Sequence, residues 1–163
     1  MNDHQIGAIT RLLNPSPGEP SWHGGATPLG SLRGVFPEQA AWKPAPKRSS
    51  IWELTLHITY WKYAVRRVLD NLPKGAFPRK PADFPKMPKS IDTKSWNADK
   101  ALLKSEHKLL CEAVAAFDPS RLTEIIEGRK YPYSELLFGI AAHDIYHVGQ
   151  IQLLKRLFLD RAK

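Results

Sequence analysis

Hydrophobic residues return every three or four positions in four long stretches of the chain, which is the period of a helix with one buried face. The pattern predicts helices at about residues 3–14, 50–69, 95–117 and 133–160. No stretch alternates clearly between hydrophobic and polar residues, and no Asn-Gly pair marks a hairpin turn. The sequence therefore predicts an all-α protein.

Helix-start signals support two of the predicted helices. Ser50 precedes Glu53 by three residues, which is the spacing of a capping box at the start of a helix. Thr27 and Pro28 suit the N-cap and the first turn of a shorter helix near residues 26–35. The residues that follow, 36–47, are predicted to be a connector.

Prolines separate the helical stretches, because proline lacks the N–H that a helix interior needs. The longest proline-rich segment, Asn71–Ser95, lies between the second and third long helices and also carries many lysines. Connections of this length are uncommon and are either mobile or functional. With a crossover of this kind, the four helices predict one four-helix bundle domain over residues 1–163. Residues 120–128 are expected to be irregular or a short extended piece.

The composition is that of an ordinary globular protein, with 42% hydrophobic and 25% charged residues in 163. No apolar run reaches the roughly 20 residues that a membrane helix needs. The first residues do not resemble a signal peptide, so a cytoplasmic location is expected. Cys111 is the only cysteine, which excludes an intrachain disulfide and a cysteine-based zinc site. We expect Cys111 to be a small core residue rather than a nucleophile.

The formal net charge of +8 would permit an anionic partner. The basic residues are scattered, however, with one modest cluster at residues 74–89 and no nucleic-acid recognition motif. The sequence therefore argues against nucleic-acid binding. We interpret residues 74–89 as a solvated connector, and the alternative is a loop that covers an anionic cosubstrate.

The last predicted helix carries two histidines, His143 and His147, on the same stripe as its inward-facing residues Leu136, Ile140, Ile151 and Leu154. Residues four apart lie one turn apart on the same helix face. Two imidazoles so placed can bind one divalent metal ion, as in zinc-binding helices with the same spacing.

A third histidine, His57, is predicted to face inward from the helix at residues 50–69 or to lie at the edge of the core. Three inward histidines indicate either a metal site or three core imidazoles, each of which needs its own hydrogen-bond partner. His107 lies near the core stripe of the third long helix and is a weaker candidate, either as a ligand or as a group behind one. His23 lies in a glycine-rich loop and would have to approach the mouth of the site.

The segments SIWELTLHITYW and HDIYHVGQIQLLKR, together with SWHGGATPLGSLRGVFPEQAAWKPAPKRSS upstream, resemble the DinB-like superfamily, also described as DinB/YfiT-like metalloenzymes. The similarity covers nearly the whole chain. It implies a four-helix bundle with an up-down-down-up-like order, a divalent metal, typically zinc or nickel, and frequent homodimers. The three metal ligands of the family would fall on His57, His143 and His147.

The resemblance also implies a range of activities, because relatives include bacillithiol-using thiol transferases and mycothiol-dependent isomerases. Three neutral imidazoles with an open fourth position are the arrangement of a catalytic zinc site. We therefore expect a metal-dependent transferase or hydrolase in which a metal-activated thiol or water attacks a small electrophile. A low-molecular-weight thiol is the implied cosubstrate. The alternative is a non-catalytic metal-binding protein that serves as a stress-response binder or scaffold.

Residues next to the histidines leave several alternatives open. Asp144 is either a surface charge or a contact within the bundle, and Gln150 contacts either a ligand or another helix. Trp61 belongs to the core or lines a pocket, whereas Tyr146 faces a dimer partner or the pocket. Gly149 is expected to permit close helix packing.

Overall fold

The computed structural model describes residues 2–16, 18–19, 25–73 and 75–161. Within this part of the chain the regular secondary structure consists of helices, without any β-strand. This confirms the all-α prediction. The elements are α1 (Asn2–Leu13), α2 (Pro28–Ser31), α3 (Pro37–Ala41), α4 (Ile51–Leu69), α5 (Thr93–Ala115), the 3-10 helix η1 (Pro119–Thr123) and α6 (Tyr133–Asp160). None of the helices described combines the length and the apolar character that crossing a membrane requires.

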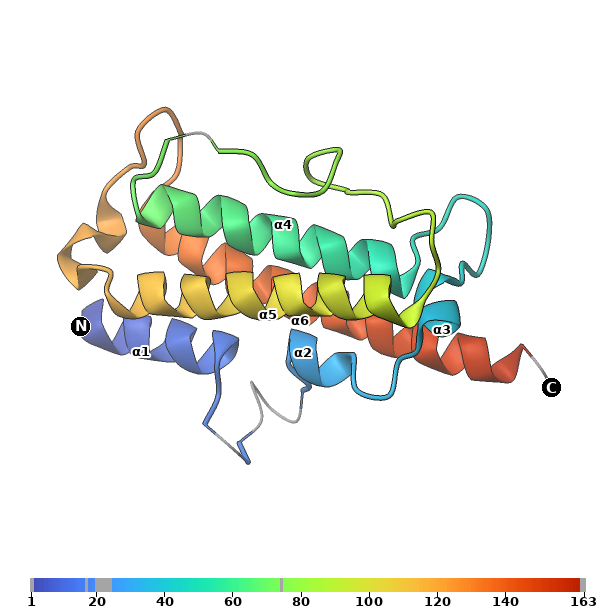
Figure 1. Ribbon diagram of the computed structural model, residues 1–163. Helices are drawn as coiled ribbons and strands as arrows, with labels where there is room; N and C mark the ends of the chain where they lie inside the picture. The colour runs from blue at the N-terminus through green and yellow to red at the C-terminus, as the bar shows by residue number, and fades with distance from the viewer. Residues whose placement is uncertain (1, 17, 20–24, 74, 162–163) are drawn as a thin grey trace.

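The four longer helices lie side by side (Figure 1). α4 packs against both α5 and α6, and α1 packs against the other faces of α5 and α6. The segment from Asp70 to Asp92 returns along α4 to the other end of the molecule, so that α4 and α5 run in the same direction. α6 then runs in the opposite direction and is the longest helix, with 28 residues.

The predicted helix starts are found at the expected residues. The Ser50 hydroxyl accepts a hydrogen bond from the Glu53 N–H, and the Glu53 carboxylate accepts one from the Ser50 N–H. This completes the capping box of α4. The Thr27 hydroxyl likewise caps α2 by accepting from the Gly30 N–H. The site helix α4 therefore begins at a position that the local sequence determines.

Two segments differ from the sequence-based expectation. The predicted connector at residues 36–47 contains α3, because Pro37 occupies the first helical position and needs no N–H there. After α5 the chain forms η1, capped by the Asp118 carboxylate, before a single antiparallel bridge between Ile125 and Pro132. The helices α3 and η1 are too short to show a hydrophobic period, so the sequence pattern could not reveal them.

The core consists of two hydrophobic clusters at opposite ends of the helix pair α4 and α6. One contains Ile51, Trp52, Leu54, Leu56 and Ile58 of α4 with Ile151 and Leu154 of α6. The other contains Val65 of α4 with Leu137, Ile140 and Ala141 of α6. Between the clusters, the buried side chains of α4 and α6 include polar ones: His57, Thr59, Lys62, Asp144 and His147. The candidate site therefore lies where the two clusters meet.

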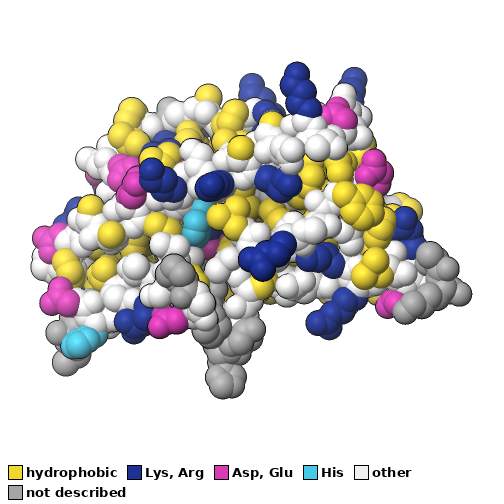
Figure 2. Space-filling view, turned by 60° about the horizontal axis from the view of Figure 1, so that its bottom comes forward, with side chains coloured by type: hydrophobic (Ala, Val, Ile, Leu, Met, Phe, Trp, Pro, Cys, Tyr) yellow, Lys and Arg dark blue, Asp and Glu magenta, His cyan; other side chains and the backbone are white. Residues whose placement is uncertain are grey.

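Basic side chains are spread among hydrophobic ones on the face of the molecule in Figure 2. They do not gather there into a single continuous patch. This distribution agrees with the scattered pattern in the sequence.

Candidate metal centre

Three histidines meet between α4 and α6. His57 comes from α4, and His143 and His147 come from successive turns of α6. Their potential ligand nitrogens all lie within 4.8 Å of one another, and His57 Nε2 lies 3.0 Å from His143 Nε2. Only 6% of His57 and 5% of His147 is exposed, while His143 is half-buried. The structure thus brings together the three residues that the sequence singled out.

A buried ion pair connects the two helices near the histidines. The Lys62 ammonium, which is completely buried, donates a hydrogen bond to the Asp144 carboxylate. Lys62 follows His57 by five residues and Asp144 is adjacent to His143. Because a charged group is stable in the interior only when it is paired, this contact disfavours any sliding of α4 along α6. The pair therefore helps to keep His57 and His143 at the same height along the two helix axes.

Two of the three imidazoles are held by hydrogen bonds at Nδ1. His57 Nδ1 donates to the Asp83 backbone carbonyl at 2.6 Å, and His147 Nδ1 donates to the Gln150 side-chain oxygen at 2.7 Å. A carbonyl oxygen can only accept, so in each ring Nδ1 carries the proton and Nε2 has a free lone pair. Such a hydrogen bond behind the ligand atom is usual for histidines that bind a metal ion.

Asp83 and Phe84 belong to the long segment between α4 and α5. Asp83 adopts φ +68°, a left-handed conformation that aspartate tolerates better than most residues. Its carbonyl contacts His57, and its carboxylate accepts a 2.7 Å hydrogen bond from Trp61 Nε1. The Phe84 ring stacks on the His57 ring with 3.9 Å between centroids. This segment therefore covers one side of the histidine cluster.

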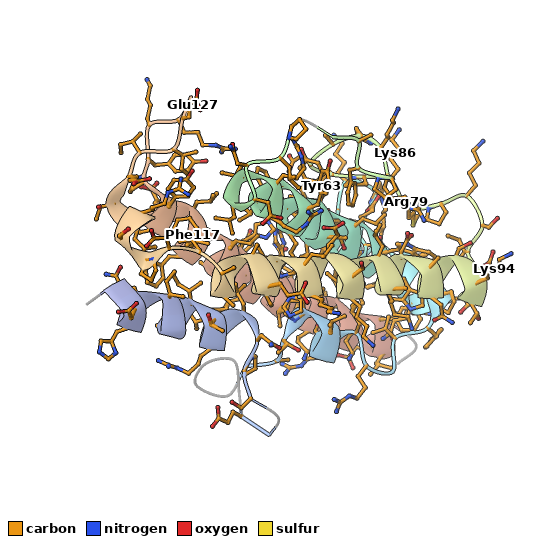
Figure 3. The ribbon with its side chains drawn as sticks, turned by 60° about the vertical axis from the view of Figure 1, so that its left-hand side comes forward. Tyr63, Arg79, Lys86, Lys94, Phe117 and Glu127 are labelled. Atoms are coloured by element: carbon orange, nitrogen blue, oxygen red, sulfur yellow. The ribbon has the colours of Figure 1, made fainter. Side chains whose placement is uncertain are left out.

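A buried carboxylate anchors the covering segment. Arg79 of the segment binds Asp99 of α5 through two guanidinium nitrogens, at 2.8 and 2.7 Å. Asp99 is fully buried and also accepts a 2.8 Å hydrogen bond from Trp52 Nε1. Figure 3 shows Arg79 where the segment passes α4. The anchor explains how a proline-rich connection can supply a fixed contact to His57.

Burial keeps the clustered histidines neutral. Desolvation lowers the pKa of His57 and of His147, although the Asp83 and Gln150 hydrogen bonds partly oppose this. The pKa of His143 falls to about 3, first because of burial and then because His147, His57 and Lys62 disfavour a further positive charge. Neutral imidazoles are the form that binds metal ions.

A family model described as DinB superfamily matches residues 29–151. The chain belongs to the DinB superfamily. The match includes all three clustered histidines and Gln150, whereas α1 lies outside it. No curated protein and no solved structure matched.

The donor set of this DinB protein fits a divalent ion. Three neutral imidazoles, two with Nε2 lone pairs freed by their Nδ1 hydrogen bonds, form the type of ligand set that zinc and nickel accept. Among the described residues the buried His143 Nδ1 has no hydrogen-bond partner, and His143 Nε2 lies 3.0 Å from His57 Nε2, within hydrogen-bonding distance. A divalent ion bound by both imidazoles would replace this contact.

Acid should destabilise the metal-free DinB protein. The pKa of a histidine in the unfolded chain is near 6.5, whereas burial in the folded protein lowers the pKa of His143 to about 3 and that of His107 to about 4. Between those values the unfolded chain binds more protons, so the free energy of unfolding falls as the pH drops below 6.5. The slope is at most about 1.4 kcal/mol per pH unit for each such histidine. Urea titrations at pH 7.5, 6 and 5 measure it.

A free energy of unfolding that stays constant from pH 7.5 to 5 would contradict this account of the histidines. His107→Ala serves as the control, because it should reduce the slope without changing metal affinity.

Gln150→Ala should weaken metal binding. It removes the acceptor that holds His147 Nδ1, and losing such a contact typically costs 10–100-fold in affinity. Gln150→Glu keeps an acceptor and should retain affinity. Gln152→Ala, two residues further along α6, is the matched control. Chelator competition gives the dissociation constants, and equal values for Gln150→Ala and Gln152→Ala would refute the role of Gln150.

The other residues that the sequence left open now have definite places. Asp144 is a contact within the helix pair, not a surface charge. Trp61 is half-buried, packs against the second core cluster and also lies beside His57 and His143.

Tyr146 lines a groove next to His147. A Cβ on Gly149 would meet nothing within 4 Å, so packing inside this chain does not require a glycine there, contrary to expectation.

His107 and Cys111 form a contact of their own on α5. His107 Nε2 lies 3.7 Å from Cys111 Sγ, and neither residue belongs to the histidine cluster. Cys111 packs against the second core cluster, and burial raises the pKa of its thiol, which agrees with a core residue rather than a nucleophile. His23 lies outside the described residues.

Asp83, Phe84 and Lys62 were missed by the sequence analysis. Asp83 is the only acidic residue between Asp70 and Asp92, which is the one local signal that could have indicated it. Nothing local shows that this segment folds back onto His57. In the sequence, Lys62 does not differ from other polar residues of a helix, because its partner Asp144 is 82 positions away in the chain.

Proposed function

We propose that this DinB protein is a metal-dependent enzyme in which His57, His143 and His147 bind a zinc or nickel ion. The observation that carries the proposal is the convergence of the three imidazoles, with Asp83 and Gln150 holding two of them so that Nε2 points to a common centre. Among the residues that the structure describes, three protein ligands converge, which is the number that catalytic zinc sites use beside an exogenous ligand.

The proposed reaction is transfer of a thiol to a small electrophile. A bound divalent ion lowers the pKa of a thiol or water and so supplies a nucleophile at neutral pH. The chain's own part is to keep the imidazoles neutral, to orient them and to shelter the centre with Phe84. In the transfer, the thiol loses its proton to solvent, a new S–C bond forms and the bond from that carbon to the leaving group breaks.

Grooves on two sides of the centre support a reaction with two substrates. His147 lines one groove and His143 lines another, and the two grooves share no lining residue. The His143 groove, of about 320 Å³, has Trp61, Ile140 and Glu135 in its walls. Two molecules can therefore approach the centre from different sides.

Metal content and turnover test this function together. The purified protein is expected to hold one zinc or nickel ion per chain and to conjugate a low-molecular-weight thiol to 1-chloro-2,4-dinitrobenzene, releasing chloride and a proton. Chelation should stop turnover, and re-addition of metal should restore it. A fully loaded protein that conjugates none of several thiols and hydrolyses no test ester would instead indicate a metal-binding protein without turnover.

We further propose that the whole chain, residues 1–163, forms one DinB-type four-helix bundle domain made of α1, α4, α5 and α6. Packing of α1 against α5, α6 and η1 supports including the residues that precede the family match.

A homodimer is also proposed, and an unpartnered line of small and apolar residues on α6 supports it. Phe138, Ala142 and Gly149 are exposed and lie within about 40° of one another around the helix, at 100° per residue. Gly149 leaves open space where a second helix can approach closely. This line faces away from both core clusters.

Phe138→Glu should convert the proposed dimer to a monomer, because it places a charge in an apolar contact. Leu159→Glu is the matched control, since Leu159 is 64% exposed but lies on another side of α6. Sedimentation velocity distinguishes the two states. A monomeric wild-type protein, or equal effects of both substitutions, would refute this interface.

A further inference from the structure

The groove beside His147 has an apolar wall that nothing in the described chain covers. It measures about 630 Å³ and lies between α6 and the residues just before α4. Leu153, Leu157 and Tyr146 line it while remaining 56%, 40% and 64% exposed. A groove of this size matches a small organic molecule, and its wall offers apolar contact. Phe84, which stacks on His57, lines the same groove, so that its inner end adjoins the histidines.

The charge of the groove has one sign. Lys47 and Arg48 are exposed and line it, and no aspartate or glutamate is among its lining residues. Neither side chain has an ion pair or hydrogen bond with any residue that the structure describes. Nearby Lys43, by contrast, is paired with Glu53 at 2.7 Å. Lys47 and Arg48 therefore keep their charge available to a ligand.

The groove on the other side of the centre, which His143 lines, differs in its charge. The ionisable residues in its lining are Glu135, Tyr131 and His143, with no lysine or arginine. The two grooves therefore select for different ligands, and the anion-binding character belongs to the His147 side.

We propose that the His147 groove binds a small amphipathic anion, in which a carboxylate or phosphate head group is joined to an apolar chain or ring. Lys47 and Arg48 hold the head group, Arg48 through its planar guanidinium, which matches the oxygens of either anion. The apolar part lies along Leu153 and Leu157. As a substrate class for the enzyme, this assignment rests on the proposed function, but binding itself requires only the groove.

Calorimetry with three eight-carbon probes tests the proposal on wild-type protein, with and without bound zinc. Octanoate and octyl phosphate should bind at least about tenfold more tightly than octylammonium, and comparing the two anions identifies the preferred head group. Lys47→Glu/Arg48→Glu should weaken binding of both anions at least about tenfold. Leu157→Gln should weaken them less, through the loss of apolar contact.

The charge control is Lys94→Glu/Lys104→Glu, which makes the same change in net charge on exposed positions of α5, away from the groove. It should leave both anion affinities within about twofold of wild type, since neither lysine lines the groove and salt screens exposed charges. Leu159→Gln is the control for Leu157→Gln. Equal affinity for octylammonium, or equal losses in the two charge variants, would overturn the proposal.

Three further outcomes separate this proposal from others. Anion binding that occurs only in Phe138→Glu would mean that a second copy covers the groove, which would overturn the assignment. If the protein holds no metal but binds octanoate through Lys47 and Arg48, the proposed metal-dependent function is refuted, whereas the proposed anion site is supported. If metal binds and turnover occurs while neither anion binds, the proposed ligand class is refuted, whereas the proposed enzymatic function is supported.

Discussion

His147→Ala should abolish stoichiometric binding of zinc or nickel. The substitution leaves two imidazoles where three converge, and it removes the one that Gln150 orients. Because loss of a contact behind a ligand already costs 10–100-fold, loss of a ligand itself should weaken affinity by at least about 100-fold. Metal analysis of the purified variant, followed by chelator competition, measures the effect.

His107→Ala is the matched control for this substitution. His107 is a half-buried histidine, but it contacts Cys111 on α5 and lies outside the cluster. Its replacement should leave metal content at the wild-type value. Full metal content in His147→Ala, in a protein whose circular dichroism is unchanged, would mean that the convergence of the three histidines does not hold a metal.

Lys62→Met should cost about 3–5 kcal/mol in the free energy of unfolding. The Asp144 carboxylate, which is only 2% exposed, would then be left inside the protein without its cation. Removing one partner of a buried ion pair is expensive because the remaining charge has lost its solvation and gained nothing in return. Urea unfolding followed by circular dichroism gives the difference from wild type.

The double substitution Lys62→Met/Asp144→Leu separates the charge effect from packing. Replacing a buried ion pair by apolar residues of similar volume is often neutral or stabilising, so the double variant should recover most of the lost stability. If the double variant is as unstable as Lys62→Met alone, the cost arises from packing and not from the unpaired carboxylate.

Metal affinity of the same double variant reports on the placement of the ligands. Lys62 follows His57 by five residues and Asp144 is adjacent to His143, so the ion pair joins the two helices that supply the ligands. A stable double variant with weakened zinc binding would show that the ion pair helps to align α4 with α6. A stable variant with unchanged affinity would assign the alignment to the two hydrophobic clusters alone.

Much of the fold was predictable because it follows from local patterns. The bounds of α6 and the capping box of α4 appear where the hydrophobic period and the residues Ser50 and Glu53 indicate them. The 3-10 helix η1 and the short α3 were not recognised, because helices of one turn carry too few residues to show a period. Their formation depends on caps and prolines.

The sequence by itself determined the three histidines of the candidate centre. His143 and His147 share a helix face by their spacing, and His57 faces inward from a second helix, so periodicity alone directs all three into the interior. Only the tertiary structure decided what surrounds them. Asp83 and Phe84 reach His57 from a segment without regular structure, and Lys62 meets Asp144 across two helices 82 positions apart in the chain. Such contacts depend on how segments pack against one another, and a one-dimensional pattern contains no signal for a partner that is distant in sequence.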